Sequence, residues 1–85
     1  DNMSKIYRIY DNEGYPEYQT TIIEDAMTYA RNKSCQFYRT VISVIYCDPA
    51  EDEEVQNNGI INEDQILVAD FYEGRLMNLY DFEEN

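Results

Sequence analysis

The sequence predicts a small α+β domain, a two-layer sandwich with one helix on one face of a mostly antiparallel sheet of about five short strands. The length of 85 residues fits a single domain with one modest core. Short runs rich in Ile, Val and Tyr alternate with turn residues, which is typical of strands. Only one stretch has apolar residues at helical spacing. The order strand-strand-helix-strand-strand-strand with short connections favours this architecture.

The first two strands are predicted as a hairpin. Residues 5–10 (KIYRIY) have the β-branched and aromatic residues of a strand, and residues 11–14 (DNEG) suit a turn. Residues 17–20 form the returning strand. Pro16 belongs at the start or edge of that strand because it has no N–H to donate.

Residues 21–32 are predicted to form the helix. Thr21 and Glu24 have the spacing of a capping box, in which each side chain accepts an N–H of the first turn. Acids near the start and bases near the end suit the helix dipole. The stripe expected to face the sheet consists of Ile22, Ile23, Ala26, Met27 and Ala30.

Residues 37–46 (FYRTVISVIY) are predicted to form the central strand because both of their alternating faces are largely apolar. Residues 48–65 form an acidic connection, which is long for a small domain. Residues 66–72 and 75–80 then form a hairpin around the two-residue link Glu73-Gly74. Residues 81–85 form an acidic tail.

The chain is expected to be one domain over residues 1–85. Met3 has the place of an initiator, so we expect Asp1 and Asn2 to be additions ahead of the natural start. No apolar run approaches the ~20 residues of a transmembrane helix. Cys35 and Cys47 are expected to be free thiols, which favours a cytoplasmic location.

The charge is the abnormal property, with eighteen acids, six bases, no His and a net charge of −12. Residues 1–47 hold six acids and five bases, whereas residues 48–85 hold twelve acids and one base. Direct nucleic-acid binding and docking on anionic membranes are disfavoured, because both need a surface of Lys and Arg. The second half of the chain therefore carries almost the whole excess.

Catalysis and metal binding are not expected. The chain has no His for a general base and no nucleophile beside a base. It has no Gly-rich phosphate loop, no paired Cys or His for a transition metal, and no match to a calcium loop. We predict a non-enzymatic protein without cofactors.

The sequence favours an acidic surface that replaces the phosphates of a nucleic acid in the basic groove of a partner protein. Spread carboxylates attract such a groove, and tyrosines among them provide rigid contact area. The plainer interpretation is that the acids serve solubility. The predicted partner-binding residues are Glu51, Asp52, Glu53, Glu54, Glu63, Asp64, Asp70, Glu73 and Asp81, with Tyr72 and Tyr80 as anchors.

In its small size, acidity and tyrosine content, rather than in any motif, the chain resembles the inhibitors that phages and mobile elements encode against host nucleases. These include anti-restriction and anti-CRISPR proteins and inhibitors of uracil-DNA glycosylase. The resemblance implies a DNA mimic that inhibits a nucleic-acid-processing enzyme through protein–protein interaction.

Two other functions stay open. A module that binds a small ligand or nucleotide signal would need converging bases from the set Lys5, Arg8, Arg31, Lys33 and Arg39. A structural or assembly subunit would pair through an exposed sheet edge. A measurement of the oligomeric state by light scattering coupled to size-exclusion chromatography would distinguish a monomer from either of these assemblies.

Overall fold

The computed structural model describes residues 6–11, 14, 16–47 and 66–80. Its elements are β1 (Ile6–Tyr10), β2 (Pro16–Thr20), α1 (Ile23–Gln36), β3 (Val41–Cys47), β4 (Ile66–Tyr72) and β5 (Arg75–Leu79). The predicted α+β class and element order are confirmed.

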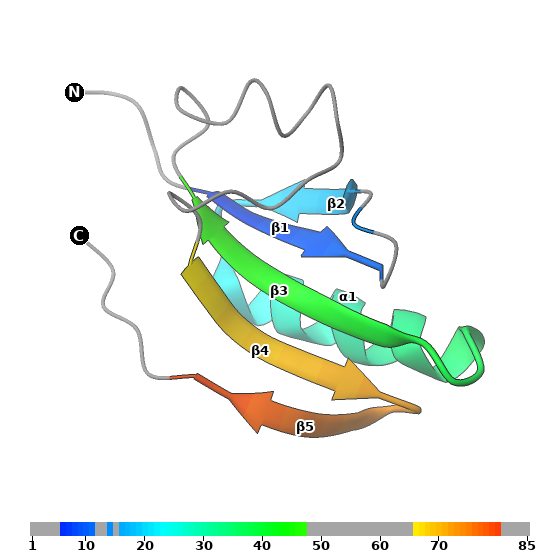
Figure 1. Cartoon of the computed structure of the whole chain (residues 1–85). Coiled ribbons are helices and arrows are strands. Elements are labelled where there is room, and N and C mark those ends of the chain that lie inside the picture. Colours follow the sequence, from blue (N-terminus) through cyan, green and yellow to red (C-terminus); the bar gives the residue numbers. More distant parts are fainter. Residues whose placement is uncertain (1–5, 12–13, 15, 48–65, 81–85) are drawn as a thin grey trace, which may run out of the picture.

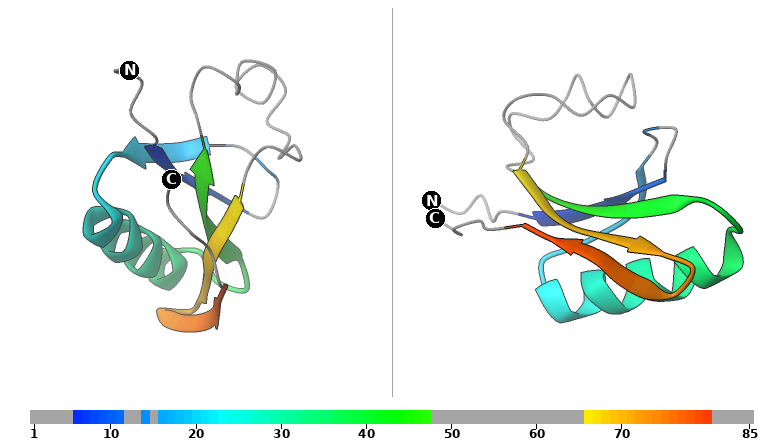
Figure 2. Two further views of the ribbon diagram at one scale, coloured as in Figure 1. Left: turned by 90° about the vertical axis from the view of Figure 1, so that its left-hand side faces the viewer. Right: turned by 60° about the horizontal axis from the view of Figure 1, so that its bottom comes forward.

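The five strands form one sheet in the order β2-β1-β3-β4-β5, and all neighbouring strands are antiparallel. β3 is central, as its two apolar faces predict. Helix α1 lies across one face of the sheet and connects the edge strand β2 with β3 (Figures 1 and 2). Pro16 begins β2, where its missing N–H costs no ladder bond at the edge of the sheet.

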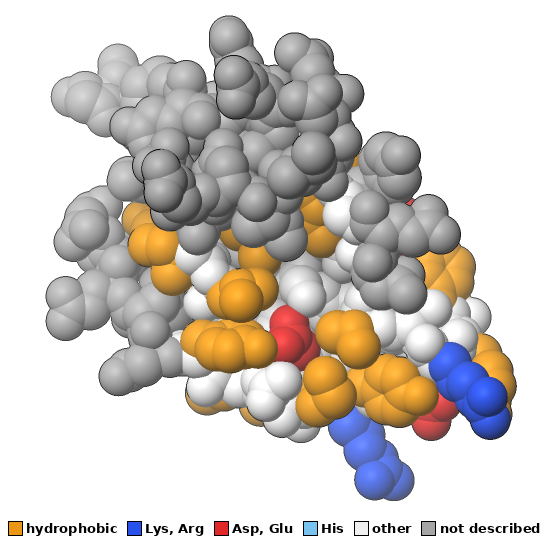
Figure 3. Space-filling model, in the orientation of Figure 1, with side chains coloured by type: hydrophobic (Ala, Val, Ile, Leu, Met, Phe, Trp, Pro, Cys, Tyr) orange, Lys and Arg blue, Asp and Glu red, His pale blue; other side chains and the backbone are white. Residues whose placement is uncertain are grey.

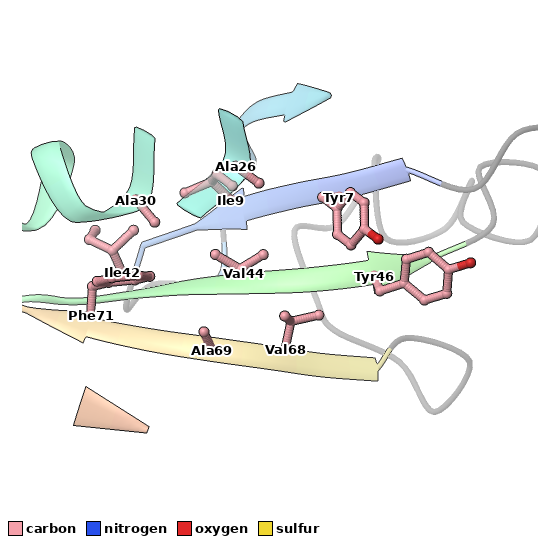
Figure 4. Packing of buried hydrophobic residues seen from close by; sticks show 10 residues of the cluster. All are labelled: Tyr7, Ile9, Ala26, Ala30, Ile42, Val44, Tyr46, Val68, Ala69 and Phe71. Atoms are coloured by element: carbon pink, nitrogen blue, oxygen red, sulfur yellow. The ribbon is translucent and has the colours of Figure 1, made fainter. Parts of the chain in front are cut away.

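The main core lies between the helix and the sheet. Small residues of α1, Ala26 and Ala30, are fully buried and allow the helix to approach the strands closely. In β1 and β3 the large side chains come from alternate positions, because successive side chains of a strand point to opposite faces. In β4 a register shift adds Val68 to the cluster beside Ala69. The cluster in Figure 4 comprises Tyr7, Ile9, Ala26, Ala30, Ile42, Val44, Tyr46, Val68, Ala69 and Phe71.

The helix begins two residues later than predicted and has no capping box. Ile22 is the N-cap residue and no side chain caps the helix. The hydroxyl of Thr20, the last residue of β2, instead accepts a hydrogen bond from the Ile22 N–H at 3.1 Å. The predicted role of Thr21 is therefore wrong.

The helix also continues to Gln36, and β3 starts only at Val41 rather than at residue 37. Ser34 is tolerated in the last turn because its hydroxyl donates to the Arg31 carbonyl oxygen at 2.8 Å. Arg39, with φ of 60°, turns the chain between helix and strand. Residues 37–40 therefore form a connection.

The predicted link between β4 and β5 is a turn with positive φ at both central residues, 51° at Glu73 and 82° at Gly74. This is the geometry of a type I′ turn, which matches the twist of the strands that it joins. The Gly74 N–H donates to Ser34 Oγ at 2.8 Å, so the turn is fixed to the end of α1. A Cβ at Gly74 would lie 2.6 Å from Cys35 Sγ.

The two cysteines are free, as predicted, with Cys35 exposed and Cys47 buried. Within the described part of the chain, no helix has the length and apolar character needed to cross a membrane.

Candidate functional site

The strand order brings the attachment points of the acidic segments to one end of the sheet. Ile6 pairs with Cys47, and Tyr46 pairs with Ile66, so β3 ends where β1 and β4 begin. The Tyr80 N–H donates to the Val68 carbonyl oxygen at 2.9 Å, which places the end of β5 there as well. We call the end of the sheet that carries these residues the acidic end (left in Figure 1).

Most of the net charge belongs to the two segments that are attached at the acidic end. Residues 48–65 contain seven acids and residues 81–85 contain three, and neither segment contains a base. Together they carry −10 of the net −12. Seven predicted partner-binding residues lie in these segments, outside the described residues: Glu51, Asp52, Glu53, Glu54, Glu63, Asp64 and Asp81.

Asp70 lies on the sheet face that is turned away from α1, and it is only 7% exposed. Its Oδ1 accepts a hydrogen bond from Ser43 Oγ at 2.7 Å. Its Oδ2 accepts one from Asn78 Nδ2 at 3.1 Å and one from the Tyr80 hydroxyl at 2.6 Å. The carboxylate therefore connects β3, β4 and the end of β5 through three neutral donors.

The hydrogen bond to Asp70 also affects Tyr80. It is the largest of the causes that raise the pKa of the Tyr80 hydroxyl above 10.0, ahead of burial and repulsion by the Asp70 charge. Because ionised Tyr80 would lose this bond and face a carboxylate, the neutral phenol is favoured. Asp70 and Tyr80 are thus brought into direct contact. Tyr80 lies next to the acidic end, whereas Asp70 is four residues into β4 from Ile66, about 13 Å from that end.

The other two predicted site residues in the described part lie at the β4–β5 turn and beside it. Glu73 is exposed in the β4–β5 turn, at the opposite end of the sheet. The seven residues of β4 separate that turn from the acidic end by about 20 Å. Tyr72 is half-buried and pairs with Arg75 next to the same turn. Tyr72 therefore lies on the same face as Asp70, two residues farther along β4, whereas Glu73 in the turn is separated from Tyr80 and the acidic end.

The bases that a nucleotide-binding pocket would need lie on different faces of one chain. Arg8 is buried on the face away from the helix, where its Nε and Nη2 donate to Gln19 Oε1 at 3.2 and 3.0 Å. On the helix side, Arg31 lies 5.0 Å from the Phe71 ring centre. Lys33 lies 4.9 Å from the Phe37 ring centre. These described bases do not converge within a single chain.

The structure reveals one surface that the sequence reasoning missed, the exposed apolar side of β5. Leu76, Met77 and Leu79 are 42%, 49% and 65% exposed. Figure 3 views the face of the sheet that is turned away from α1, and hydrophobic side chains predominate over acidic ones among its described residues. The signal was present in residues 75–79 (RLMNL), because an exposed strand with apolar side chains on both faces is unusual.

No protein-family profile, curated protein or solved structure matches the chain. Among the side chains that the structure describes, no three of His, Cys, Asp and Glu gather to hold a metal ion. The features that the structure describes are the attachment of two acidic segments at one end of the sheet and the exposed apolar side chains of β5.

Proposed function

We propose that the chain is a non-enzymatic interaction protein that occupies the basic, nucleic-acid-binding groove of a partner enzyme and so inhibits it. The observation that supports this proposal is the attachment of two segments with a charge of −10 at one end of the sheet. We propose that the basic groove of the partner is attracted to this end of the sheet.

The described scaffold is nearly neutral and supports such an arrangement. It contains six acids and five bases, so its own charge neither adds to nor cancels the field of the acidic segments. A local excess of one sign raises the association rate with an oppositely charged groove and makes binding sensitive to salt. A partner that binds phosphates has the charge that this end attracts.

The contribution of the described acids to this field is unequal. The Asp70 carboxylate is buried and bonded to three internal donors, so its main role is within the sheet. Tyr80 is 36% exposed next to the acidic end, and its ring offers contact area there. We propose that the acids of residues 48–65 and 81–85 supply the charge and that Tyr80 borders the contact.

The first experiment tests competition with nucleic acid. Proteins from an extract of the cell in which the chain acts are bound to immobilised duplex DNA at low salt, and the chain is added as the eluent. We expect it to release a protein that polyglutamate of equal charge concentration leaves bound. The released protein should bind either the chain or DNA, but not both. Simultaneous binding of both would contradict the proposal.

Two matched variants test where the charge acts. Glu53→Gln with Glu54→Gln removes two charges from the segment between β3 and β4. Glu24→Gln with Asp25→Asn removes two exposed charges from the start of α1. At about 0.2–1 kcal/mol per surface ion pair with the partner, we expect the first pair of substitutions to weaken binding roughly 2- to 30-fold. The second pair should change it less than twofold. Equal effects, or an affinity independent of salt, would refute the charge-based mechanism.

A phage-encoded inhibitor of this kind would act in the cytoplasm of its host. We propose this location because the free thiols suit a reducing compartment.

A further inference from the structure

The two edges of the sheet differ in how they are protected. β2, at one edge, begins with Pro16, which has no N–H, and next carries the charged Glu17. These are features that discourage pairing with another strand. β5, at the other edge, has Arg75 as its only charge and exposes Leu76, Met77 and Leu79. An open edge of this composition is a site for strand addition.

One helix is too narrow to cover this edge of the sheet. A helix is about 10 Å wide, whereas the outer strands of a five-stranded sheet lie roughly 19 Å apart. Leu76 pairs with Phe71 and Leu79 pairs with Ala69, and both β4 residues belong to the core under α1. Leu76 and Leu79 therefore point to the helix side of the sheet but remain exposed beside the helix.

The backbone of β5 is selective for its partner. The register between β4 and β5 shifts by one residue, because Asp70 pairs with Asn78 and Phe71 with Leu76. Antiparallel residues alternate between facing the neighbouring strand and facing away from it. The Tyr80 N–H faces β4, so Leu79 faces away. Leu76 also faces away, because Arg75 before it closes the turn with Tyr72.

The outward backbone groups of β5 are thus three residues apart, at Leu76 and Leu79. A regular strand presents such groups every two residues and matches only one of these positions at a time. A strand with the same irregular spacing matches both. The β5 strand of a second copy has that spacing. β2, the other edge strand, also has a one-residue shift, but that shift lies at Glu17, next to Pro16, which has no N–H to donate.

We propose that β5 pairs antiparallel with β5 of a second copy of this chain, with Leu76 of each copy opposite Leu79 of the other. The pairing has twofold symmetry and joins the two sheets into one continuous sheet with both helices on the same face. The four leucines then fill the strip between the helices. This inference goes beyond the proposed function and does not depend on it.

Charge on the other face supports the same register. Pairing Leu76 with Leu79 also places Arg75 opposite Tyr80 of the second copy. Both of these side chains lie on the face that carries Asp70, since Arg75 pairs with Tyr72 and Tyr80 bonds to Asp70. Within the described residues, Asp70 is bonded only to neutral donors, and Arg75 has no ion pair. The second copy therefore brings a cation toward a buried carboxylate and its phenol.

The antiparallel arrangement also separates the acidic ends of the two copies. Each β5 of five residues is about 17 Å long, and the paired strands run in opposite directions. The two acidic ends then lie at opposite ends of the joint, farther apart than the Debye length of about 8 Å at physiological salt. The high net charge is thus compatible with a second copy in this orientation.

Light scattering coupled to size-exclusion chromatography tests the proposal on the full chain. We expect a mass near twice 10.1 kDa that falls to 10.1 kDa on dilution. Leu79→Lys should give a monomer at concentrations at which the wild type is a dimer. Thr28→Lys, the same charge change at an exposed helix position, should leave the dimer intact. A wild type that is monomeric at every concentration, or a dimer unaffected by Leu79→Lys, would overturn the proposal.

Amide hydrogen exchange tests the register without relying on a variant that must fold. The amides of Leu76 and Leu79 should exchange at least tenfold more slowly at a concentration that favours the dimer than at one that favours the monomer.

Arg75→Glu should raise the dissociation constant of the dimer at least tenfold, and added salt should reduce this difference from the wild type. Concentration-dependent protection in β2 instead of β5 would show that the other edge pairs and would refute the inference.

Discussion

The buried carboxylate of Asp70 permits a quantitative test of what holds the last three strands together. Asp70→Ala removes the acceptor of the hydrogen bonds from Ser43, Asn78 and Tyr80. A hydrogen bond to a charged group contributes about 1.5–3 kcal/mol. Asn78 and Tyr80 are exposed and regain water when the carboxylate is lost, whereas Ser43 is half-buried. We therefore expect a loss of about 2–4 kcal/mol in the free energy of unfolding.

This loss is large for a chain of this size. Typical stabilities of roughly 0.05–0.15 kcal/mol per residue correspond to about 4–13 kcal/mol for 85 residues. The midpoint of thermal unfolding should fall by roughly 8–30 °C, at about 4–8 °C per kcal/mol. Urea unfolding followed by circular dichroism gives the free energy, and an unchanged m-value shows that the variant unfolds from the same compact state.

The measurement is made in a Leu79→Lys background, so that self-association does not contribute. Glu24→Ala is the control, because it removes an exposed carboxylate from the first turn of α1 and should cost less than about 1 kcal/mol. If the free energy of unfolding of Asp70→Ala lies within about 0.5 kcal/mol of that of the Leu79→Lys parent, the carboxylate does not connect the strands in the way described.

Two further predictions follow from the β4–β5 hairpin. Gly74→Ala should destabilise the chain by more than about 1 kcal/mol, because φ is 82° and the new Cβ would meet Cys35 Sγ at 2.6 Å. Adding Cys35→Ala should restore only the part of the lost stability that the contact with Sγ causes. Full recovery of the stability would contradict a contribution from the positive φ of Gly74. The raised pKa of Tyr80 predicts that its contribution to stability is complete below pH 10 and is lost as the pH rises through the higher folded value. The free energy of unfolding, measured by denaturation from pH 8 to 12, should decline less steeply with pH for Tyr80→Phe than for the wild type. Parallel curves would refute the link between the raised pKa of Tyr80 and stability.

The sequence predicts the order and type of the elements because hydrophobic periodicity and turn residues are local signals. The Glu73-Gly74 link is correct because few residue pairs accept positive φ at both turn positions. The boundaries of the helix are wrong for a non-local reason. Ser34 has low helix propensity, but it is buried, and its Oγ accepts a hydrogen bond from the Gly74 N–H in a turn forty residues later.

The candidate site was predictable only in part. The common attachment of the two acidic segments follows from antiparallel strand order, which the element pattern already implied. Strand register was not predictable, so the contact of Asp70 with Tyr80 could not be separated from the other acid–tyrosine pairs. The one-residue shift within β5 has no sequence signal, since Met77 resembles an ordinary strand residue.

The position of Cys35 has a practical consequence. Its thiol is exposed whereas that of Cys47 is buried, so a maleimide reagent should modify Cys35 first. Cys35 lies near the β4–β5 turn, at the far side of the sheet from Cys47 and Ile66. Coupling through this sulfur would therefore anchor the protein to a sensor chip in one orientation, with the strand ends that precede and follow residues 48–65 directed into solution.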